Sequence, residues 1–364
     1  MNKKPTILIF GPLPPPAGGI SIHIWRLKYL LEQEFTVDFI DEASTRKKEY
    51  YNVKSFNPFP YLQKIGKADI LYIQTGSRIL KKLHILTGKL MGKKMIITLH
   101  GYGPRRKMPF RAIDSFFFRM ADKIILVNPD IFNRLSLPTE KCIYKHAFLP
   151  PVMQEEAALP AHVSDWMNNT RRSGASILCA NASRLDIFQG QELYGLDMCI
   201  DVSKRLMEKR IPVGFIYTVS STEHCADRFE QYQQQIKSLG LSDQFLLLHE
   251  KVSFVKVIER SDVVVRPTNT DGDALTIREA IYLGKPILAS DVVERPEGTT
   301  LFKTRDLDDL EAKLVELIKE KQSGKAIGVT GPAANQTDFK QFYSNLIHDV
   351  LNRKAYNVSG KALA

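Results

Sequence analysis

The feature that most constrains this chain is the stretch of residues 261–291, in which an apolar run, a polar loop, a helical pattern and a second apolar run follow one another. The first run ends at Pro267, as a buried strand does where it enters a loop. Residues 274–283 have a helical pattern, and Gly284 predicts the end of that helix. This order predicts a βαβ unit with the loop at the carboxyl edge of a parallel sheet.

Acidic side chains and a helix start meet in that loop. Asp271 lies in the loop, Asp273 is expected to cap the helix, and Glu279 lies in its second turn. The free amides at the helix start are those of Ala274, Leu275 and Thr276. Because a helix N-terminus favours negative charge and a free carboxylate binds hydroxyls, the loop suits a sugar attached to a nucleotide diphosphate.

The same stretch resembles the nucleotide-sugar site of GT-B glycosyltransferases, specifically of the retaining family 4. That family has Glu, seven residues, Glu, then Ala and Gly-Lys-Pro; here the frame is Asp271, seven residues, Glu279, then Ala280 and residues 284–286. The resemblance implies that Asp271 contacts the donor sugar and that Glu279 holds the ribose hydroxyls. It also implies transfer without a cofactor or an essential metal.

A different interpretation of the loop is a metal-binding Asp-x-Asp, as in GT-A enzymes, formed by Asp271 and Asp273. Two carboxylates so close can hold Mg or Mn across a diphosphate. The triplet lies far along the chain, however, and capping the helix is a simpler role for Asp273. We therefore expect no metal ligand here.

Two further points of resemblance lie in the first half of the chain. Gly18 and Gly19 separate a predicted strand from a predicted helix, where the backbone can approach a phosphate. His100 ends the predicted strand of residues 95–99 and precedes Gly101. In the family, the glycine loop meets the donor phosphates and the acceptor, and the histidine lies beside the donor sugar. The resemblance implies hydrogen bonding by His100 near the reacting centre.

A third point of resemblance is Arg184, which follows the predicted strand of residues 176–181. A guanidinium is a natural partner for phosphate oxygens, and the family arginine here grips the diphosphate. The family also has a lysine before glycine, where this chain has Tyr194. A tyrosine supplies no charge, so either another basic residue such as Arg266 compensates, or the donor or the activity is unusual.

The length of 364 residues suits two domains. We expect an α/β protein with two Rossmann-like domains facing a cleft, the GT-B arrangement. Residues 1–150 would form the acceptor domain and residues 151–337 the nucleotide-sugar domain, which opens with a polar stretch at 154–174. A last helix, at residues 338–356, would cross back to the N-terminal domain.

The net charge of +11 suits an anionic partner. The segment with Arg105, Arg106, Lys107 and Arg111, followed by a phenylalanine cluster, can seat the chain on an anionic membrane; equally, the phenylalanines can be helix core and the arginines a solvated face. We find no nucleic-acid-binding motif and no apolar run long enough for a membrane span. We expect a cytoplasmic protein, with peripheral attachment to the inner face of the cytoplasmic membrane left open.

The resemblance implies a retaining glycosyltransferase that uses a nucleotide-diphosphate sugar. The acceptor would be a glycan or a polyprenyl-diphosphate-linked glycan, in bacterial surface polysaccharide assembly. Two alternatives share the fold: a nucleotide-sugar-binding protein with impaired catalysis, and a nucleotide-sugar epimerase.

Overall fold

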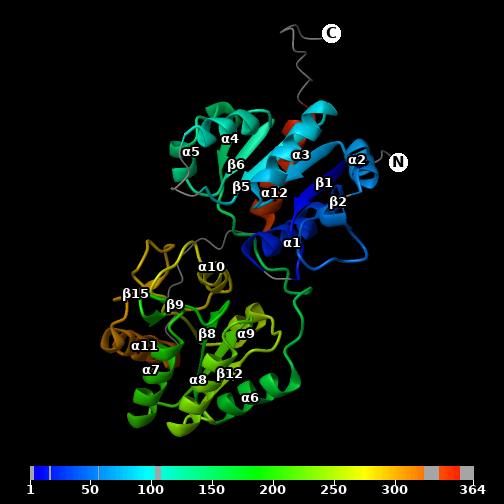
Figure 1. Cartoon of the computed structure of the whole chain (residues 1–364). Helices are drawn as coiled ribbons and strands as arrows, with labels where there is room; N and C mark the ends of the chain where they lie inside the picture. The colour runs from blue at the N-terminus through cyan, green and yellow to red at the C-terminus, as the bar shows by residue number, and fades with distance from the viewer. Residues whose placement is uncertain (1–3, 16–17, 56, 103–107, 324–335, 353–364) are drawn as a thin grey trace. The chain divides into compact units, whose positions relative to one another are not determined.

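The computed structural model describes residues 4–15, 18–55, 57–102, 108–323 and 336–352. The chain divides into two compact units, which we treat separately: Met1–Leu149 with Asn335–Ala364, and Pro150–Ala334 (Figure 1). Arg105, Arg106 and Lys107 lie outside the described residues.

The N-terminal unit is built on a seven-stranded sheet in the order β3-β2-β1-β4-β5-β6-β7, in which every pairing is parallel. Its strands are β1 (Thr6–Gly11), β2 (Thr36–Asp41), β3 (Tyr51–Asn52), β4 (Ile70–Ile73), β5 (Lys94–Leu99), β6 (Lys123–Leu126) and β7 (Cys142–Tyr144). The inner strands β4 and β6 are buried along their whole length, as expected for a sheet covered on both faces.

Helices cover both faces of this sheet. One face packs on α2 (Pro58–Lys67), α3 (Arg78–Leu90) and α4 (Phe110–Phe118), through one apolar core. On the other face, α1 (Gly19–Leu31) contacts the last helix, α12 (Gln336–Asn352), and α12 also contacts β5. The short α5 (Asp130–Arg134) precedes β7. The C-terminal helix therefore returns to the N-terminal unit.

The C-terminal unit has a six-stranded parallel sheet in the order β12-β11-β8-β13-β14-β15. Its strands are β8 (Ser176–Ala182), β11 (Val213–Val219), β12 (Phe245–Leu248), β13 (Val263–Arg266), β14 (Ile287–Ser290) and β15 (Thr300–Phe302). A small antiparallel hairpin of β9 (Ile187–Phe188) and β10 (Gln191–Glu192) follows β8.

Alternation along the central strand places helices on both faces of this second sheet. In β8, Leu178 and Ala180 face the core of α7 (Leu196–Glu208), α8 (Ala226–Ser238) and α11 (Leu307–Gln322). Ile177 and Cys179 face the core of α6 (Ala161–Arg172), α9 (Phe254–Arg260) and α10 (Leu275–Tyr282). Both units thus confirm the predicted α/β class, although the stretch at residues 154–174, predicted to be merely polar, contains α6.

The strand order places a reversal of winding between β8 and β13. From β8 the chain adds β11 and then β12 on one side, and it returns to add β13, β14 and β15 on the other. Helices that leave the two central strands lie on opposite faces, and the carboxyl ends of β8 and β13 are the position at which doubly wound sheets bind their ligands.

We expect the buried strand β14 to tolerate truncation poorly. Leu288 in β14 is fully buried, whereas Leu301 in β15 is 44% exposed. Leu288→Ala should lower the free energy of unfolding by about 2–5 kcal/mol through lost burial and a residual cavity, and Leu301→Ala by much less. Urea unfolding of both variants measures this, and equal losses would contradict the assigned core.

Candidate functional site

The carboxyl edge of the C-terminal sheet carries a buried cluster of two arginines and one aspartate. Arg266, the last residue of β13, donates to Asp271 through Nε at 3.0 Å and through Nη2 at 3.1 Å. Arg295, which follows β14, donates to the same carboxylate at 2.9 Å. The Arg295 side chain is 2% exposed, so the ion pair is nearly free of solvent.

The Asp271 carboxylate has no acceptor position left. Besides the three arginine bonds, it accepts from the Thr268 hydroxyl at 3.1 Å and from the Gly272 amide at 3.0 Å. Five donors therefore share a group with about four lone-pair positions. Burial opposes ionisation, but the hydrogen bonds and charges of Arg266 and Arg295 outweigh it and lower the pKa of Asp271.

This arrangement corrects one expectation and adds one residue. The free carboxylate predicted at Asp271 is not free, because the two guanidiniums already bind it. Arg295 was not predicted, since it comes from the loop after the next strand and no local motif marks it. The cluster has one more positive than negative charge, so it still favours an anion nearby.

The start of α10 also differs from the prediction. Ala274 is the N-cap and makes no side-chain capping bond, whereas Asp273 forms an ion pair with Arg278 at 2.6 Å. The prediction that Asp273 caps this helix is therefore wrong. Both acids of the Asp-x-Asp triplet are in ion pairs with arginines. Among the described residues, no group of three or more His, Cys, Asp or Glu side chains could hold a metal ion.

The first turns of α10 lie beside the end of β8. The Thr276 hydroxyl donates to the Asn181 side chain at 2.9 Å, and Asn181 is the penultimate residue of β8. The amides of Ala274, Leu275 and Thr276 precede the first complete turn, where helix amides have no intrahelical acceptor. Glu279 is buried one turn further along. Helix amides and Glu279 thus belong to the same strand edge as the arginine cluster.

Tyr194 connects the end of β8 with the end of β13. Its hydroxyl lies 2.6 Å from the Ser183 hydroxyl, and the Arg266 guanidinium lies 5.1 Å from its ring centroid. A cation over an aromatic face is attracted to it, so the tyrosine supports Arg266. Arg184, next to Ser183, is 55% exposed and pairs with Asp186. Because exposed ion pairs are weak, its guanidinium can exchange partners easily.

Glu192, the last residue of β10, occupies the N-terminus of α7. Its Oε2 accepts from the Leu196 amide at 2.8 Å, and its Oε1 has no hydrogen-bond partner in the described part of the chain. Burial raises the pKa of Glu192 to about 7, against the opposing effect of backbone amides. Sequence reasoning missed this residue, because no local motif marks the hairpin that carries it.

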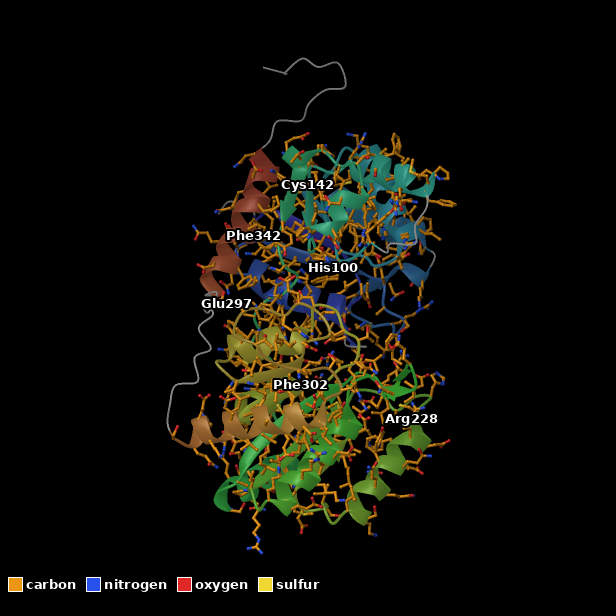
Figure 2. The ribbon with its side chains drawn as sticks, turned by 90° about the vertical axis from the view of Figure 1, so that its left-hand side faces the viewer. His100, Cys142, Arg228, Glu297, Phe302 and Phe342 are labelled. Carbon is orange, nitrogen blue, oxygen red and sulfur yellow. The ribbon has the colours of Figure 1, made fainter. Side chains whose placement is uncertain are left out.

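In the N-terminal unit, His100 directly follows the last residue of β5. It is one of the residues labelled in Figure 2. Its Nε2 is 3.0 Å from Gln74 Oε1, and its ring packs edge-on against His23, with 5.1 Å between ring centroids. Burial, with smaller contributions from His23 and Lys81, holds the pKa of His100 well below its usual value. His100 is therefore a neutral hydrogen-bonding group at neutral pH.

Gly18 and Gly19 lie where helix α1 begins. Gly18 is its N-cap, and the Gly18 amide donates to the Ser21 hydroxyl at 2.8 Å. Both glycines are exposed, and a Cβ at either position would meet nothing closer than 3.8 Å. The packing of the unit itself therefore does not require glycine at either position.

The C-terminal unit matches a known family. Residues 188–320, which include β10, the arginine cluster and α10, match the model of glycosyl transferases group 1. The matched segment carries most of the groups described at the strand edge. The resemblance to glycosyltransferases noted in the sequence is confirmed at this level.

Solved structures share the fold of the whole chain. HepE from Anabaena, solved with UDP and also with UDP-glucose, has a TM-score of 0.65 and 16% identity in its UDP complex, over 94% of this chain and 100% of its own. A glycosyltransferase from Rickettsia africae has a TM-score of 0.71 and 15% identity, over 97% and 100%. Sucrose-phosphate synthase from Thermosynechococcus elongatus has 0.60 and 13%, over 95% and 100%. The shared fold is that of GT-B glycosyltransferases.

Neither a curated relative of this sequence nor a membrane-spanning helix in the described part of the chain was found. None of the curated proteins compared with this sequence matches it. No helix in the described part of the chain combines the length and apolarity needed to cross a membrane.

We expect Glu192→Gln to change how stability depends on pH. The folded-state pKa of about 7 exceeds the ordinary value of 4.5, so the contribution of Glu192 is fully present below the ordinary value and is lost as pH rises through 7. Glutamine removes this titration and keeps an acceptor for the Leu196 amide. Relative to the native chain, the variant should gain on the order of 3 kcal/mol at most between pH 5 and pH 8.

Urea unfolding of the full chain at both pH values measures this gain. The exposed Glu230 in α8 offers a matched control, since Glu230→Gln should leave the pH dependence unchanged. Parallel pH curves for the native chain and Glu192→Gln would show that Glu192 titrates normally in the folded protein.

Proposed function

We propose that this glycosyltransferase moves a sugar from a nucleotide-diphosphate donor to a glycan or polyprenyl-diphosphate-linked acceptor, with retention of configuration and without an essential metal. The observation that carries the proposal is the match of residues 188–320 to glycosyl transferases group 1, in a unit whose strand order reverses between β8 and β13, beside the arginines and the start of α10. The complexes of HepE with UDP and UDP-glucose support a nucleotide-sugar donor on this fold.

The charges at the strand edge suit a leaving diphosphate. As the bond to the sugar breaks, negative charge accumulates on the nucleotide diphosphate, and fixed positive groups stabilise it most effectively. Arg184 can leave its exposed pair with Asp186 to bind phosphate oxygens, and the amides of Ala274, Leu275 and Thr276 add partial positive charge. Glu279 would accept the ribose hydroxyls.

The role proposed for Asp271 follows from its saturated carboxylate. Asp271 positions Arg266 and Arg295 rather than accepting a sugar hydroxyl directly. The ring of Tyr194 packs against the Arg266 guanidinium and helps to hold it in place. The Arg266 guanidinium lies 5.1 Å from the Tyr194 ring centroid, so a lysine in place of Tyr194 would bring a second cation close to it, and the two charges would repel each other. Tyrosine at position 194 is therefore compatible with the ion pair of Arg266 and Asp271, whereas lysine would not be.

The N-terminal unit supplies the acceptor side in this proposal. Gly18 and Gly19 would let the backbone approach the donor phosphates and acceptor, and neutral His100 would hydrogen-bond to a sugar hydroxyl. The setting that we propose is the assembly of bacterial surface polysaccharide at the inner face of the cytoplasmic membrane, on the strength of the family resemblance.

A second candidate is a nucleotide-sugar-binding protein that does not transfer. The saturated Asp271 and the tyrosine at position 194 both favour it, because each removes a group that the family uses on the donor. The two functions predict the same binding and differ in turnover, so a donor labelled in its sugar distinguishes them. Sugar found on an acceptor glycan supports transfer, and binding without product supports the second candidate.

We expect one class of nucleotide to raise the melting temperature of the full chain, in a screen of UDP, GDP, ADP, CMP and their common sugars. A ligand that binds only the folded state stabilises it by mass action. Glu279→Gln should weaken the binding of that nucleotide about tenfold to a hundredfold, because charged hydrogen bonds to the ribose contribute about 1.5–3 kcal/mol.

A matched control is Glu259→Gln in α9. The Glu259 carboxylate is exposed and forms an ion pair with Lys256 at 3.2 Å. It should bind the nucleotide as the native chain does. Unchanged affinity in Glu279→Gln would remove Glu279 from the site, and no shift with any nucleotide would contradict the proposed donor.

A further inference from the structure

Helix α3 buries Ile85 against the sheet but also exposes apolar side chains to the outside. Its outward side carries an apolar stripe whose members are four, three and four residues apart, the spacing of one helix face. The stripe consists of Ile79, Leu83, Leu86 and Leu90, and the two end residues are 81% and 79% exposed. On the inward side, Lys81 and His84 are buried.

Polar contacts inside the unit fix this orientation. His84 Nδ1 is 2.8 Å from the Tyr61 hydroxyl of α2, and His84 Nε2 is 3.0 Å from Glu42 Oε1. Lys81 is buried near Glu42 and Asp114, and its ammonium lies 5.8 Å from the Phe118 ring centroid. Rotating α3 to bury its leucines would break these contacts, so the exposed stripe is part of the folded structure.

The neighbouring helices repeat the pattern. In α4, Asp114 is buried and bound by Lys82 of α3 at 2.7 Å and by the Tyr102 hydroxyl at 2.9 Å, while Phe110 and Phe116 point outward, with Phe116 62% exposed. We call the outward side chains of α2, α3 and α4 the apolar face: Phe59, Leu62, Ile79, Leu83, Leu86, Leu90, Phe110, Ile113 and Phe116. These helices lie along one face of the N-terminal sheet (Figure 1).

Such a face is uncommon on a chain that has no partner there. Of the fifteen large apolar side chains exposed in the described part of the chain, eleven fall between residues 59 and 116. Clusters of exposed apolar side chains mark contact with a protein or with a membrane, whereas single ones are ordinary.

The charge of this region distinguishes the two kinds of partner. Residues 57–119 contain 13 of the 51 Lys and Arg but only 2 of the 40 Asp and Glu, so the net charge of +11 arises in this segment and the rest of the chain balances. Asp114 is paired with Lys82, Asp69 accepts from the Thr6 amide at 2.7 Å, and Lys64 pairs with Asp38 outside the segment. The segment therefore keeps an excess of basic residues beside its apolar side chains, which matches an anionic bilayer.

A pocket beside α4 gathers arginine side chains next to the apolar face. It has a volume of about 380 Å³, and its lining includes the arginines at positions 111, 119 and 134, the Ser115 and Ser136 residues, and the apolar Met108 and Phe116. Arginine guanidiniums bind phosphate oxygens in a forked geometry. A lipid phosphate in this pocket would place its acyl chains beside Phe116, on the apolar face.

We infer that the apolar face seats the N-terminal unit on an anionic phospholipid bilayer. Helices α3 and α4 lie in the plane of the interface, with their outward stripes at the boundary between headgroups and acyl chains. Lysine and arginine side chains around the stripes contact the headgroups, and the pocket takes a lipid phosphate. This inference does not depend on the proposed sugar transfer.

Sedimentation of the full chain with vesicles tests the inference. The native chain should bind vesicles of phosphatidylcholine with about one third phosphatidylglycerol, and it should bind phosphatidylcholine alone much more weakly. The double variant Ile79→Ser, Leu90→Ser should bind the anionic vesicles at least about tenfold less, because both side chains are exposed and lose their apolar contact with lipid.

Leu301→Ser, also exposed but in the C-terminal unit, is the matched control and should bind vesicles as the native chain does. Equal binding by the double variant and the native chain would overturn the inference. Failure of the native chain to bind anionic vesicles would overturn it as well. A native dimer that the double variant abolishes, without vesicle binding, would assign the face to a second copy instead. Melting shifts with nucleotides should be unchanged in the double variant, so the two proposals fail separately.

Discussion

The carboxyl edge of the C-terminal sheet depends on one carboxylate. Two guanidiniums from successive strand ends would repel each other in a buried position, and Asp271 holds both. Because its charge is bound from five directions, the loops after β13 and β14 are joined at one point. Tyr194 then rests against Arg266 and links this point to the end of β8. The geometry that a donor would meet is therefore built from long-range contacts.

The secondary structure around this edge was predictable because local rules decide it. The apolar run of β13 and the glycine after α10 mark a strand and a helix end with little ambiguity, and the strand order follows from winding rules once these elements are known. Helix α6 was missed because only Val163 and Met167 are buried in it, so its apolar side is too narrow to recognise without the sheet that it covers.

The side-chain partners were much less predictable. Asp273 has the residue type of a cap, but Arg278 lies one turn away and binds its carboxylate instead. Arg295 joins the cluster through the neighbouring strand, and Glu192 reaches the start of α7 through a hairpin. Each contact joins segments whose proximity is a property of the folded sheet and leaves no periodic signal. Residue types at strand ends therefore indicated a candidate site, whereas the contacts inside it could be described only from the three-dimensional structure.

The N-terminal unit keeps two properties on opposite sides of the same helices. The inward polar residues of α3, His84 and Lys81, hold the helix to the sheet and to its neighbours, while the outward leucines make no comparable contribution to folding. Mutations on the two sides therefore have separate effects. Substitution on the inner side mainly changes how well the unit folds, and substitution of the most exposed outward residues, Ile79 and Leu90, mainly changes the surface offered to the proposed bilayer. Single substitutions at exposed outward residues can accordingly change how strongly this surface binds its partner, with little effect on the stability of the domain.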